Sequence, residues 1–100
     1  MGLVSQLPGG EISKDRPAVI VSNDVANRLL NRIQVVPLTT QVAKVYPGEA
    51  VVDVRGKKRK AMADQIVTAD KSRVQNLVGR LSMADMEKVE HALTVQLGLS

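Results

Sequence analysis

The sequence predicts a mainly β protein, in which a small antiparallel sheet or barrel is followed by α-helices at the C-terminal end. Short apolar runs that stop at Pro, Gly or Asn fill the first part of the chain, which is typical of strands. From residue 70 onward, apolar residues recur at helical spacing. No repeated βαβ pattern occurs before that point, and this disfavours a parallel sheet.

The composition limits the kind of protein. One hundred residues predict a single domain over 1–100 with one core, which must be aliphatic because Tyr46 is the only aromatic residue. The chain has no cysteine, which removes disulfides and thiolate metal sites. It also lacks a membrane-length apolar run and the pattern of a signal peptide, so we expect a cytoplasmic protein without a membrane partner.

The net positive charge is concentrated in one run. The chain has 14 basic and 10 acidic residues, which gives an excess of +4. One run of four consecutive basic residues carries as much charge as this whole excess. A concentrated run predicts a polyanionic partner. The alternative is a solvated hairpin tip, because Gly56 predicts a turn over residues 55–60. The run consists of Lys57, Lys58, Arg59 and Lys60.

The strand that starts near Arg16 is the most regular of the predicted strands. A short strand within residues 3–7 and a mobile loop up to residue 15 precede it. Pro17 lacks an amide donor and therefore suits the start of a strand. The apolar residues 18–21 that follow predict burial on both faces, and Asn23 or Asp24 then predicts the cap of a short helix. Arg16 is thus expected at the mouth of a rigid, buried strand.

The remaining barrel strands are predicted over residues 32–38, 49–54 and 61–67, so that the strands occupy 16–67. Pro37 indicates an edge or the end of its strand, and residues 42–48 form a loop. Asp64 and Gln65 fall within or near the last strand, which is an unusual place for two polar residues unless they are used or exposed.

The C-terminal part, residues 70–100, is predicted to be helical. A first short helix has apolar residues at 74, 77 and 78 and ends at Gly79. In the second helix Ser82 is the N-cap and Asp85 stands three residues on, as in a capping box. The apolar face of this helix is expected to contain Met86, Val89, Leu93 and Leu97, before Gly98 ends it.

Several motifs occur in an order that resembles the MazF/PemK/Kid family of toxin ribonucleases. They are Gly10-Glu11 before Arg16-Pro17, Val-Ile-Val-Ser-Asn-Asp with Asn27, Val36-Pro37-Leu38-Thr39, Asp64-Gln65-Ile66 with Thr68 and Asp70-Lys71, Gly79-Arg80-Leu81-Ser82, and Leu97-Gly98-Leu99. The resemblance runs from about residue 10 to residue 99. Residues 1–7 are shorter than the family's usual first strand and lack its aromatic residues and its carboxylate.

This resemblance implies a small SH3-like antiparallel β-barrel of the CcdB/PemK type that forms a homodimer. It implies sequence-specific cleavage of single-stranded RNA, chiefly mRNA, without a metal or another cofactor. It also implies a type II toxin–antitoxin system, in which the extended C-terminal tail of a cognate antitoxin occupies the RNA groove. By resemblance, Arg16 and Thr39 are the catalytic pair, and Asp64 matches a carboxylate that accepts the proton in some members.

The chemistry of these residue types suits metal-independent cleavage, in which the 2′-OH of the RNA attacks the phosphate. A mechanism with two histidines is excluded because His91 is the only histidine, and its helical position predicts exposure. Arg16 offers a planar fork of donors for phosphate oxygens. Its alternative role is a surface ion pair with Asp15 or Glu49.

Further residues are candidates for RNA binding. Thr39 and Thr40 offer hydroxyl groups, although both types also occur simply in strands and turns. Asn23 and Gln65 carry amides that can read bases or satisfy backbone groups. Glu11, from the mobile loop, is a second candidate proton acceptor.

Two other functions stay open at this point. The chain can be a non-catalytic toxin of the same fold that binds a protein such as DNA gyrase, as the CcdB group does. It can also be an inactive remnant that still binds an antitoxin, in line with its short first strand.

Overall fold

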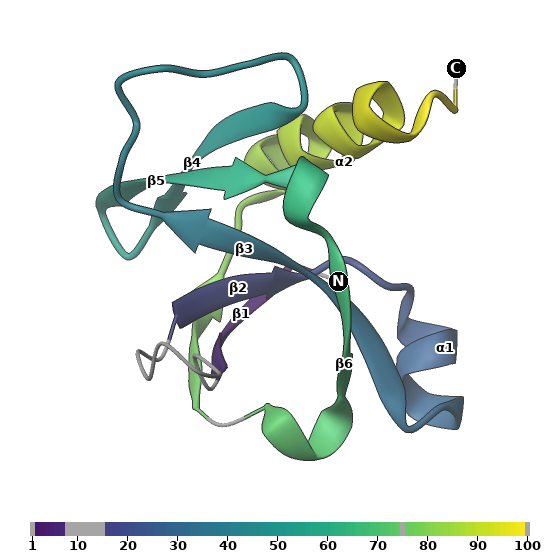
Figure 1. Cartoon of the computed structure of the whole chain (residues 1–100). Coiled ribbons are helices and arrows are strands. Elements are labelled where there is room, and N and C mark those ends of the chain that lie inside the picture. The colour runs from purple at the N-terminus through teal and green to yellow at the C-terminus, as the bar shows by residue number, and fades with distance from the viewer. Residues whose placement is uncertain (1, 8–15, 75, 100) are drawn as a thin grey trace.

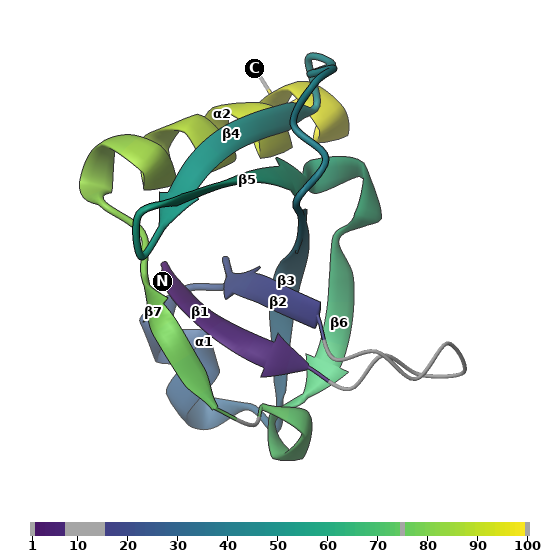
Figure 2. The ribbon, with the colours of Figure 1, turned by 90° about the vertical axis from the view of Figure 1, so that its left-hand side faces the viewer.

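The computed structural model describes residues 2–7, 16–74 and 76–99, which form a strongly curved antiparallel sheet closed on one side by a helix (Figures 1 and 2). The strands are β1 (Leu3–Leu7), β2 (Arg16–Ile20), β3 (Arg32–Thr39), β4 (Glu49–Val54), β5 (Lys57–Met62), β6 (Val67–Asp70) and β7 (Leu77–Arg80). The helices are α1 (Asp24–Leu29), η2 (Ala63–Gln65), η3 (Lys71–Arg73) and α2 (Met83–Leu97), of which η2 and η3 are single 3₁₀ turns.

The strand order gives a small barrel. Hydrogen-bonded neighbours follow the order β4-β5-β3-β2-β1-β7, and β6 pairs with the other part of β3. Figure 2 shows the strands curving around a common interior, with α2 lying across β4. The expected mainly β fold, an antiparallel barrel with a C-terminal helix, is confirmed.

The long strand β3 and its neighbour β2 are both buried on two faces, and for β2 the apolar run over residues 18–21 had predicted this. Val19 and Val36 belong to the main core cluster, which α2 closes with Met86 and Val89. The neighbouring positions of both strands point the other way into a second cluster, which contains Ala18, Ile20, Ile33, Val35 and Ala69. The two clusters fix β2 and β3 from both sides, so the ends of these strands are well placed to carry a functional site.

Pro37 lies inside β3, where the strand changes its neighbour. Residues 32–35 pair with β6, and Leu38 and Thr39 pair with β5. Pro37 itself pairs with Ala18 on the β2 side. Because Pro37 falls between the residues that pair with β6 and those that pair with β5, its missing N–H removes no bond from either ladder. Pro37 was expected at an edge or near the end of a strand over residues 32–38, and β3 ends one residue beyond that range, at Thr39.

The turn between β4 and β5 is tighter than the turn predicted over residues 55–60. Arg55 and Gly56 both have positive φ, 52° and 82°, as in a two-residue type I′ hairpin. β5 therefore begins at Lys57 and contains the basic run, so the prediction that the run lies in the turn was wrong. β5 also ends early, at Met62, because η2 and Ile66 separate it from β6. The prediction of a single strand over residues 61–67 was therefore wrong.

The predicted helix that ends at Gly79 was also wrong. Leu77–Arg80 is the strand β7, which pairs antiparallel with β1 and gives that strand a second neighbour. Three apolar residues at 74, 77 and 78 are too few to separate a helix from a strand. The strand forms because β1 would otherwise have an open edge, and an open edge favours the addition of a strand.

Helix α2 begins and ends as predicted. The Ser82 hydroxyl accepts the N–H of Asp85 at 3.1 Å, and Gly98 adopts the left-handed conformation at the C-cap. The Asp85 carboxylate does not complete a capping box; it accepts the N–H of Asp53 at 2.8 Å and thereby ties the helix start to β4. Leu97, expected on the buried face, is 52% exposed. Among the described residues no helix has the length and apolar character needed to span a membrane.

Candidate functional site

Arg16 and Thr39 lie at the same end of the paired strands β2 and β3. The ladder joins Ala18 to Pro37; Arg16 precedes Ala18 by two residues and Thr39 follows Pro37 by two. In an antiparallel ladder these two steps run in the same direction, and two residues keep each side chain on the same face. Figure 1 shows the start of β2 and the tip of β3 on one side of the molecule. The fold therefore brings together two residues that are distant in sequence.

Arg16 is exposed at the first position of β2, next to the buried residues 18–20. In the part of the chain that the structure describes, no carboxylate forms an ion pair with its guanidinium group. Glu49, one of the two partners considered for it, pairs with Lys60 instead. Asp15, the other partner, lies outside the described residues. Arg16 thus presents its donors at the surface from a rigid base, as an anion-binding arginine requires.

Thr39 is half-buried and closes a small turn. Its Oγ1 accepts the backbone N–H of Gln41 at 3.3 Å, which is the structural role considered for it. This bond uses a lone pair of the hydroxyl group and leaves its hydrogen, so Thr39 keeps a donor for an anionic oxygen.

Lys60 is part of the packed structure and is not a solvated side chain at a hairpin tip. It pairs with Thr39 in the β3–β5 ladder. Its Nζ lies 3.2 Å from Oε1 of Glu49, with both side chains only 12% exposed, and it donates to the carbonyl of Lys44 at 2.9 Å. The same Glu49 oxygen accepts the N–H of Tyr46 at 2.9 Å. The ion pair therefore fixes the loop that follows Thr39.

The other three basic residues of the run are more accessible. Lys57 and Lys58 are exposed and Arg59 is half-buried. Lys58 lies opposite Asp53 in the β4–β5 ladder, with 3.9 Å between charged atoms, an exposed contact of little energetic weight. The positive charge of the run is thus available to a partner at residues 57–59 and used internally at residue 60.

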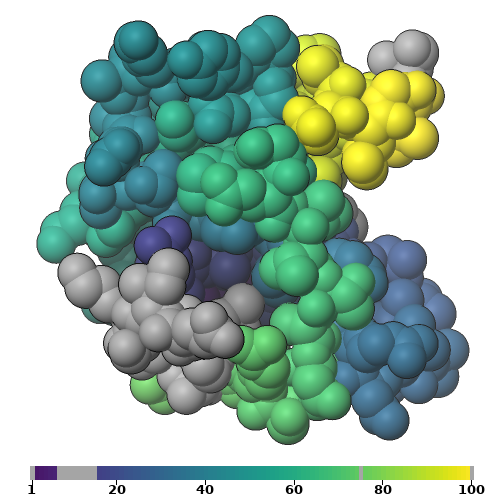
Figure 3. Space-filling view, viewed as in Figure 1, coloured from purple at the N-terminus to yellow at the C-terminus, as the bar shows by residue number. Residues whose placement is uncertain are grey.

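Asp64 and Gln65 are exposed on η2 and are not within a strand, which explains two polar residues at this place. Gln65 donates to the sulfur of Met62 at 3.4 Å, a weak contact. Figure 3 shows a hollow in the surface that η2 borders from above and β6 from the side, with β2 inside it. The helix that carries Asp64 and the strand that begins at Arg16 therefore border the same hollow.

Asp64 also lines a small cavity of about 180 Å³ together with Tyr46, Gly48, Glu49 and Gln96. Tyr46, Gly48 and Gln96 were not predicted to be functional residues. The position of the only aromatic residue on a surface loop was a signal for Tyr46; Gln96 had none, because it reaches the cavity from the distant helix α2.

The remaining candidates are Asn23, Thr40 and Glu11, of which only Thr40 lies next to this region within the described residues. Asn23 is the N-cap of α1, and its Oδ1 accepts the N–H of Ala26 at 2.8 Å, so its acceptor satisfies the backbone. It follows the far end of β2 from Arg16. Thr40 is exposed next to Thr39. Glu11 lies outside the described residues.

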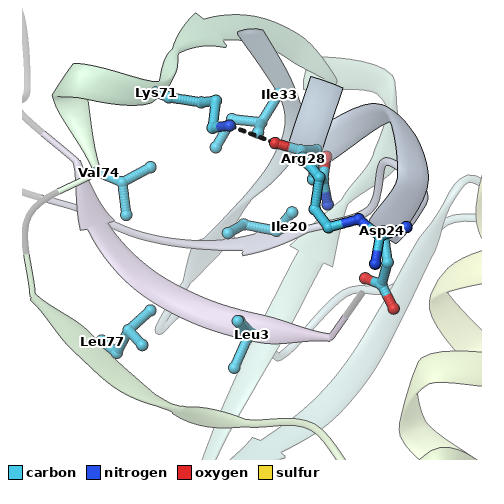
Figure 4. A pocket seen from close by; sticks show the side chains of 9 residues that line it. Leu3, Ile20, Asp24, Arg28, Ile33, Lys71, Val74 and Leu77 are labelled. Atoms are coloured by element: carbon cyan, nitrogen blue, oxygen red, sulfur yellow. Dashed lines mark hydrogen bonds between the residues drawn. The ribbon is translucent and has the colours of Figure 1, made fainter. Parts of the chain in front are cut away.

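A second pocket, of about 800 Å³, is lined by Ile20, which lies at the opposite end of β2 from Arg16 (Figure 4). Its wall is largely aliphatic, from Leu3, Ile20, Ile33, Val74 and Leu77, and Lys71 closes one side by donating to the carbonyl of Asn27. Arg16, Thr39 and Asp64 are not among the residues that line it. Asp24 and Arg28 also line this pocket, so its wall combines a large aliphatic surface with charged groups.

Neither a histidine nor a metal site takes part in this arrangement. His91 is exposed on α2, as expected. Within the described ranges no group of three or more His, Cys, Asp or Glu residues is placed to hold a metal ion. What the site offers is a guanidinium group and a hydroxyl group at one strand end, and a carboxylate across a hollow.

Comparison with known proteins assigns the chain to a class of toxins. The model of the family described as PemK-like, MazF-like toxin of type II toxin–antitoxin systems matches residues 2–97, and the chain belongs to this family.

Named relatives and solved structures agree with this assignment. The chain is 37% identical over 100 residues to the endoribonuclease MazF9 of Mycobacterium tuberculosis, covering 91% of this chain and 85% of the relative. It is 31% identical over 101 residues to the endoribonuclease EndoA of Bacillus subtilis, covering 96% and 87%. A mycobacterial endoribonuclease in complex with its cognate antitoxin superposes with a TM-score of 0.88 at 29% identity, covering 99% and 94% of the two chains. The MazE–MazF complex of Deinococcus radiodurans gives a TM-score of 0.80 at 27% identity, covering 99% and 94%.

Proposed function

We propose that this toxin is an endoribonuclease that cuts single-stranded RNA, chiefly mRNA, without a metal ion. The observation that carries the proposal is the position of Arg16 and Thr39 at the same end of adjacent strands. A guanidinium group and a hydroxyl group at one point supply hydrogen-bond donors to the oxygens of a single phosphate. The names of the relatives, endoribonucleases MazF9 and EndoA, support the same activity.

The proposed reaction begins with attack of the 2′-oxygen on the neighbouring phosphorus. Asp64 takes the proton from the 2′-OH, a bond forms between the 2′-oxygen and phosphorus, and the bond from phosphorus to the 5′-oxygen breaks. The leaving 5′-oxygen takes a proton from water. Arg16 and Thr39 donate to the phosphate oxygens, where negative charge accumulates in the transition state. The products are a 2′,3′-cyclic phosphate and a 5′-hydroxyl end.

The exposed basic residues extend the RNA contact along β5. Lys57 and Lys58 are exposed and Arg59 is half-buried, all on β5, the strand that pairs with the end of β3 at Thr39. We propose that they follow the phosphates on either side of the cut, so that binding weakens as salt rises. Gln65 is next to Asp64 and Thr40 is next to Thr39, and we propose that both contact the RNA. We propose the same for Glu11, which precedes Arg16 in the sequence.

We further propose that the toxin acts in the cytoplasm as a homodimer and is inhibited by a cognate antitoxin whose tail enters the RNA groove. Large apolar side chains are exposed on α1 and at the end of α2, including Leu29 at 77% and Leu99 at 72%. Figure 1 shows these two segments on the same side of the molecule. Exposed apolar groups on one side are typical of an interface between subunits.

The test is incubation of the purified protein with a long unstructured RNA in the presence of EDTA. Discrete fragments with 2′,3′-cyclic phosphate ends are expected, and their loss in Arg16→Ala and Thr39→Ala. Arg32→Ala is the matched control, because Arg32 is also an exposed arginine at the first position of a strand but stands at the far end of β3. Intact RNA would refute the nuclease; inhibition of DNA gyrase or antitoxin binding alone would then identify a toxin of a different kind.

A further inference from the structure

The small cavity beside Asp64 has the size and the chemistry of a pocket for a nucleobase. Its volume is about 180 Å³, and it lies among a tyrosine, a carboxamide and a carboxylate, from Tyr46, Gln96 and Asp64. Tyr46 is 61% exposed, so its ring is accessible for stacking. Aromatic rings stack on bases, whereas carboxamide and carboxylate groups bond the polar edges of bases.

The loop that carries Tyr46 is held in place on three sides. Tyr46 donates its N–H to the carboxylate of Glu49 and accepts the N–H of Glu49 on its carbonyl, both at 2.9 Å. The Gly48 carbonyl accepts the N–H of Ala63, the first residue of η2, at 3.1 Å. The Lys60–Glu49 ion pair lies beneath this turn. A fixed aromatic platform loses little entropy on binding, which favours recognition.

Gly48 gives the carboxamide of Gln96 its place in the cavity. A Cβ atom at residue 48 would lie 2.6 Å from Oε1 of Gln96, which is too close for any real contact. The neighbouring atom is the flexible end of a side chain, so an alanine here would displace the carboxamide and leave the backbone in place. The absence of a side chain at Gly48 therefore shapes the polar wall of the cavity.

We infer that this cavity is a base-binding subsite of the toxin, and that it takes a nucleobase with an exocyclic amino group. Tyr46 stacks on the base, and Gln96 bonds its edge with both a donor and an acceptor. One carboxylate oxygen of Asp64 accepts from the amino group, which leaves the other oxygen for the proton of the 2′-OH. Uracil has no amino group to donate to the carboxylate. The inference rests on the proposed ribonuclease function and deepens it, because the base would hold the RNA strand beside the carboxylate that takes the proton.

The chain offers a direct optical test. Because Tyr46 is the only aromatic residue, tyrosine fluorescence reports on the subsite alone. The probes are 2′-O-methyl oligouridines, which cannot be cleaved, and variants of them in which one uridine is replaced by cytidine, adenosine or guanosine. Their affinity is also measured by the fluorescence anisotropy of a label at one end. Quenching of Tyr46 and tighter binding of an oligonucleotide with an amino-bearing base than of oligouridine are expected.

Variants separate stacking from edge recognition. We expect Tyr46→Ala to weaken binding roughly tenfold, the usual scale for one stacked base, and Tyr46→Phe to restore it. Gly48→Ala is expected to remove the preference over oligouridine while the fold stays intact by circular dichroism. Val45→Ala is the matched loop control; Val45 is 48% exposed, does not line the cavity, and is expected to bind as the unaltered chain does.

Two results would overturn the inference and one would overturn the function on which it rests. Binding without quenching, with equal affinity in Tyr46→Ala, would exclude the stacking platform. Equal affinity for all the probes would exclude the amino-bearing base. If none of the oligonucleotides binds to the unaltered chain, the proposed action on RNA is itself wrong.

Discussion

Nζ of Lys60 lies 3.2 Å from Oε1 of Glu49, and both side chains are almost enclosed. Each partner has a second bond to the loop after Thr39, Lys60 to the Lys44 carbonyl and Glu49 to the Tyr46 N–H. This pair connects the β3–β5 ladder, in which Thr39 lies opposite Lys60, to a loop that has no regular structure of its own. It is the feature that makes the Thr39 side of the site rigid.

The ion pair predicts a strong coupling between its two residues. Lys60→Met should lower the free energy of unfolding by about 3 kcal/mol, because it leaves an enclosed carboxylate without its partner. Glu49→Gln, which keeps an acceptor for Tyr46, should cost less. The double variant should cost less than the sum of the two single losses, as urea denaturation can measure. Additive losses would show that the two groups do not depend on each other.

The β4–β5 hairpin predicts opposite effects at its two turn residues. Gly56 has φ of 82° and an added Cβ would contact nothing within 4 Å, so Gly56→Ala isolates backbone strain and should cost about 1 kcal/mol. Arg55→Asn should stabilise the protein slightly, since asparagine tolerates the positive φ of 52° at that position. Both changes are read from thermal or urea unfolding. A neutral Gly56→Ala would contradict a type I′ turn.

Helix α2 should depend on its N-cap. Ser82→Ala removes the acceptor of the Asp85 N–H and should cost about 1 kcal/mol of stability. Met83→Ala is the neighbouring control, since that side chain is 85% exposed and its loss should change stability very little. Equal stability of the two variants in urea would show that the cap does not stabilise the helix.

The hydrogen bonds of Asp70 at the start of η3 predict a small loss of stability at low pH. The N–H of Ser72 donates to Asp70 at 2.9 Å, and this bond, together with the Ser72 hydroxyl, holds the pKa of Asp70 below its ordinary value of 3.8. A carboxyl group with a lowered pKa in the folded state stabilises the fold above its unfolded pKa, and this contribution disappears as pH falls through the folded pKa. Asp70→Asn should therefore flatten the acid limb of the stability curve. An unchanged acid limb would contradict the lowered pKa.

Much of the fold could be predicted because its signals are local. The Ser82 cap, the Gly98 end and the apolar run after Pro17 each determine the structure within a few residues, and all three were correct. The strand β7 was missed because its formation depends on the open edge of β1, far away in the sequence. The basic run was placed in a turn because charge normally favours solvent, whereas Lys60 lies in a strand and meets Glu49 from the neighbouring strand.

The candidate site could also be predicted only in part. Arg16 and Thr39 were named from the motifs that resemble the family, and the register of β2 and β3 then puts them at one strand end. The cavity with Tyr46 and Gln96 was not foreseen, because its walls come from a loop, a 3₁₀ turn and a helix that only tertiary packing brings together. Asn23 was considered as a base reader, but its acceptor caps α1.

The central claim is that Arg16 and Thr39 act on one phosphate, and single-turnover cleavage of one defined RNA by four proteins tests it most directly. The four are the unaltered chain, Arg16→Ala, Thr39→Ala and the double variant, compared in EDTA with Arg32→Ala as the control. Each single variant should be slower by about 100-fold or more, and the double variant little slower than the worse single one, because groups that act as a unit are not additive. Cleavage at the full rate in either single variant would contradict the claim.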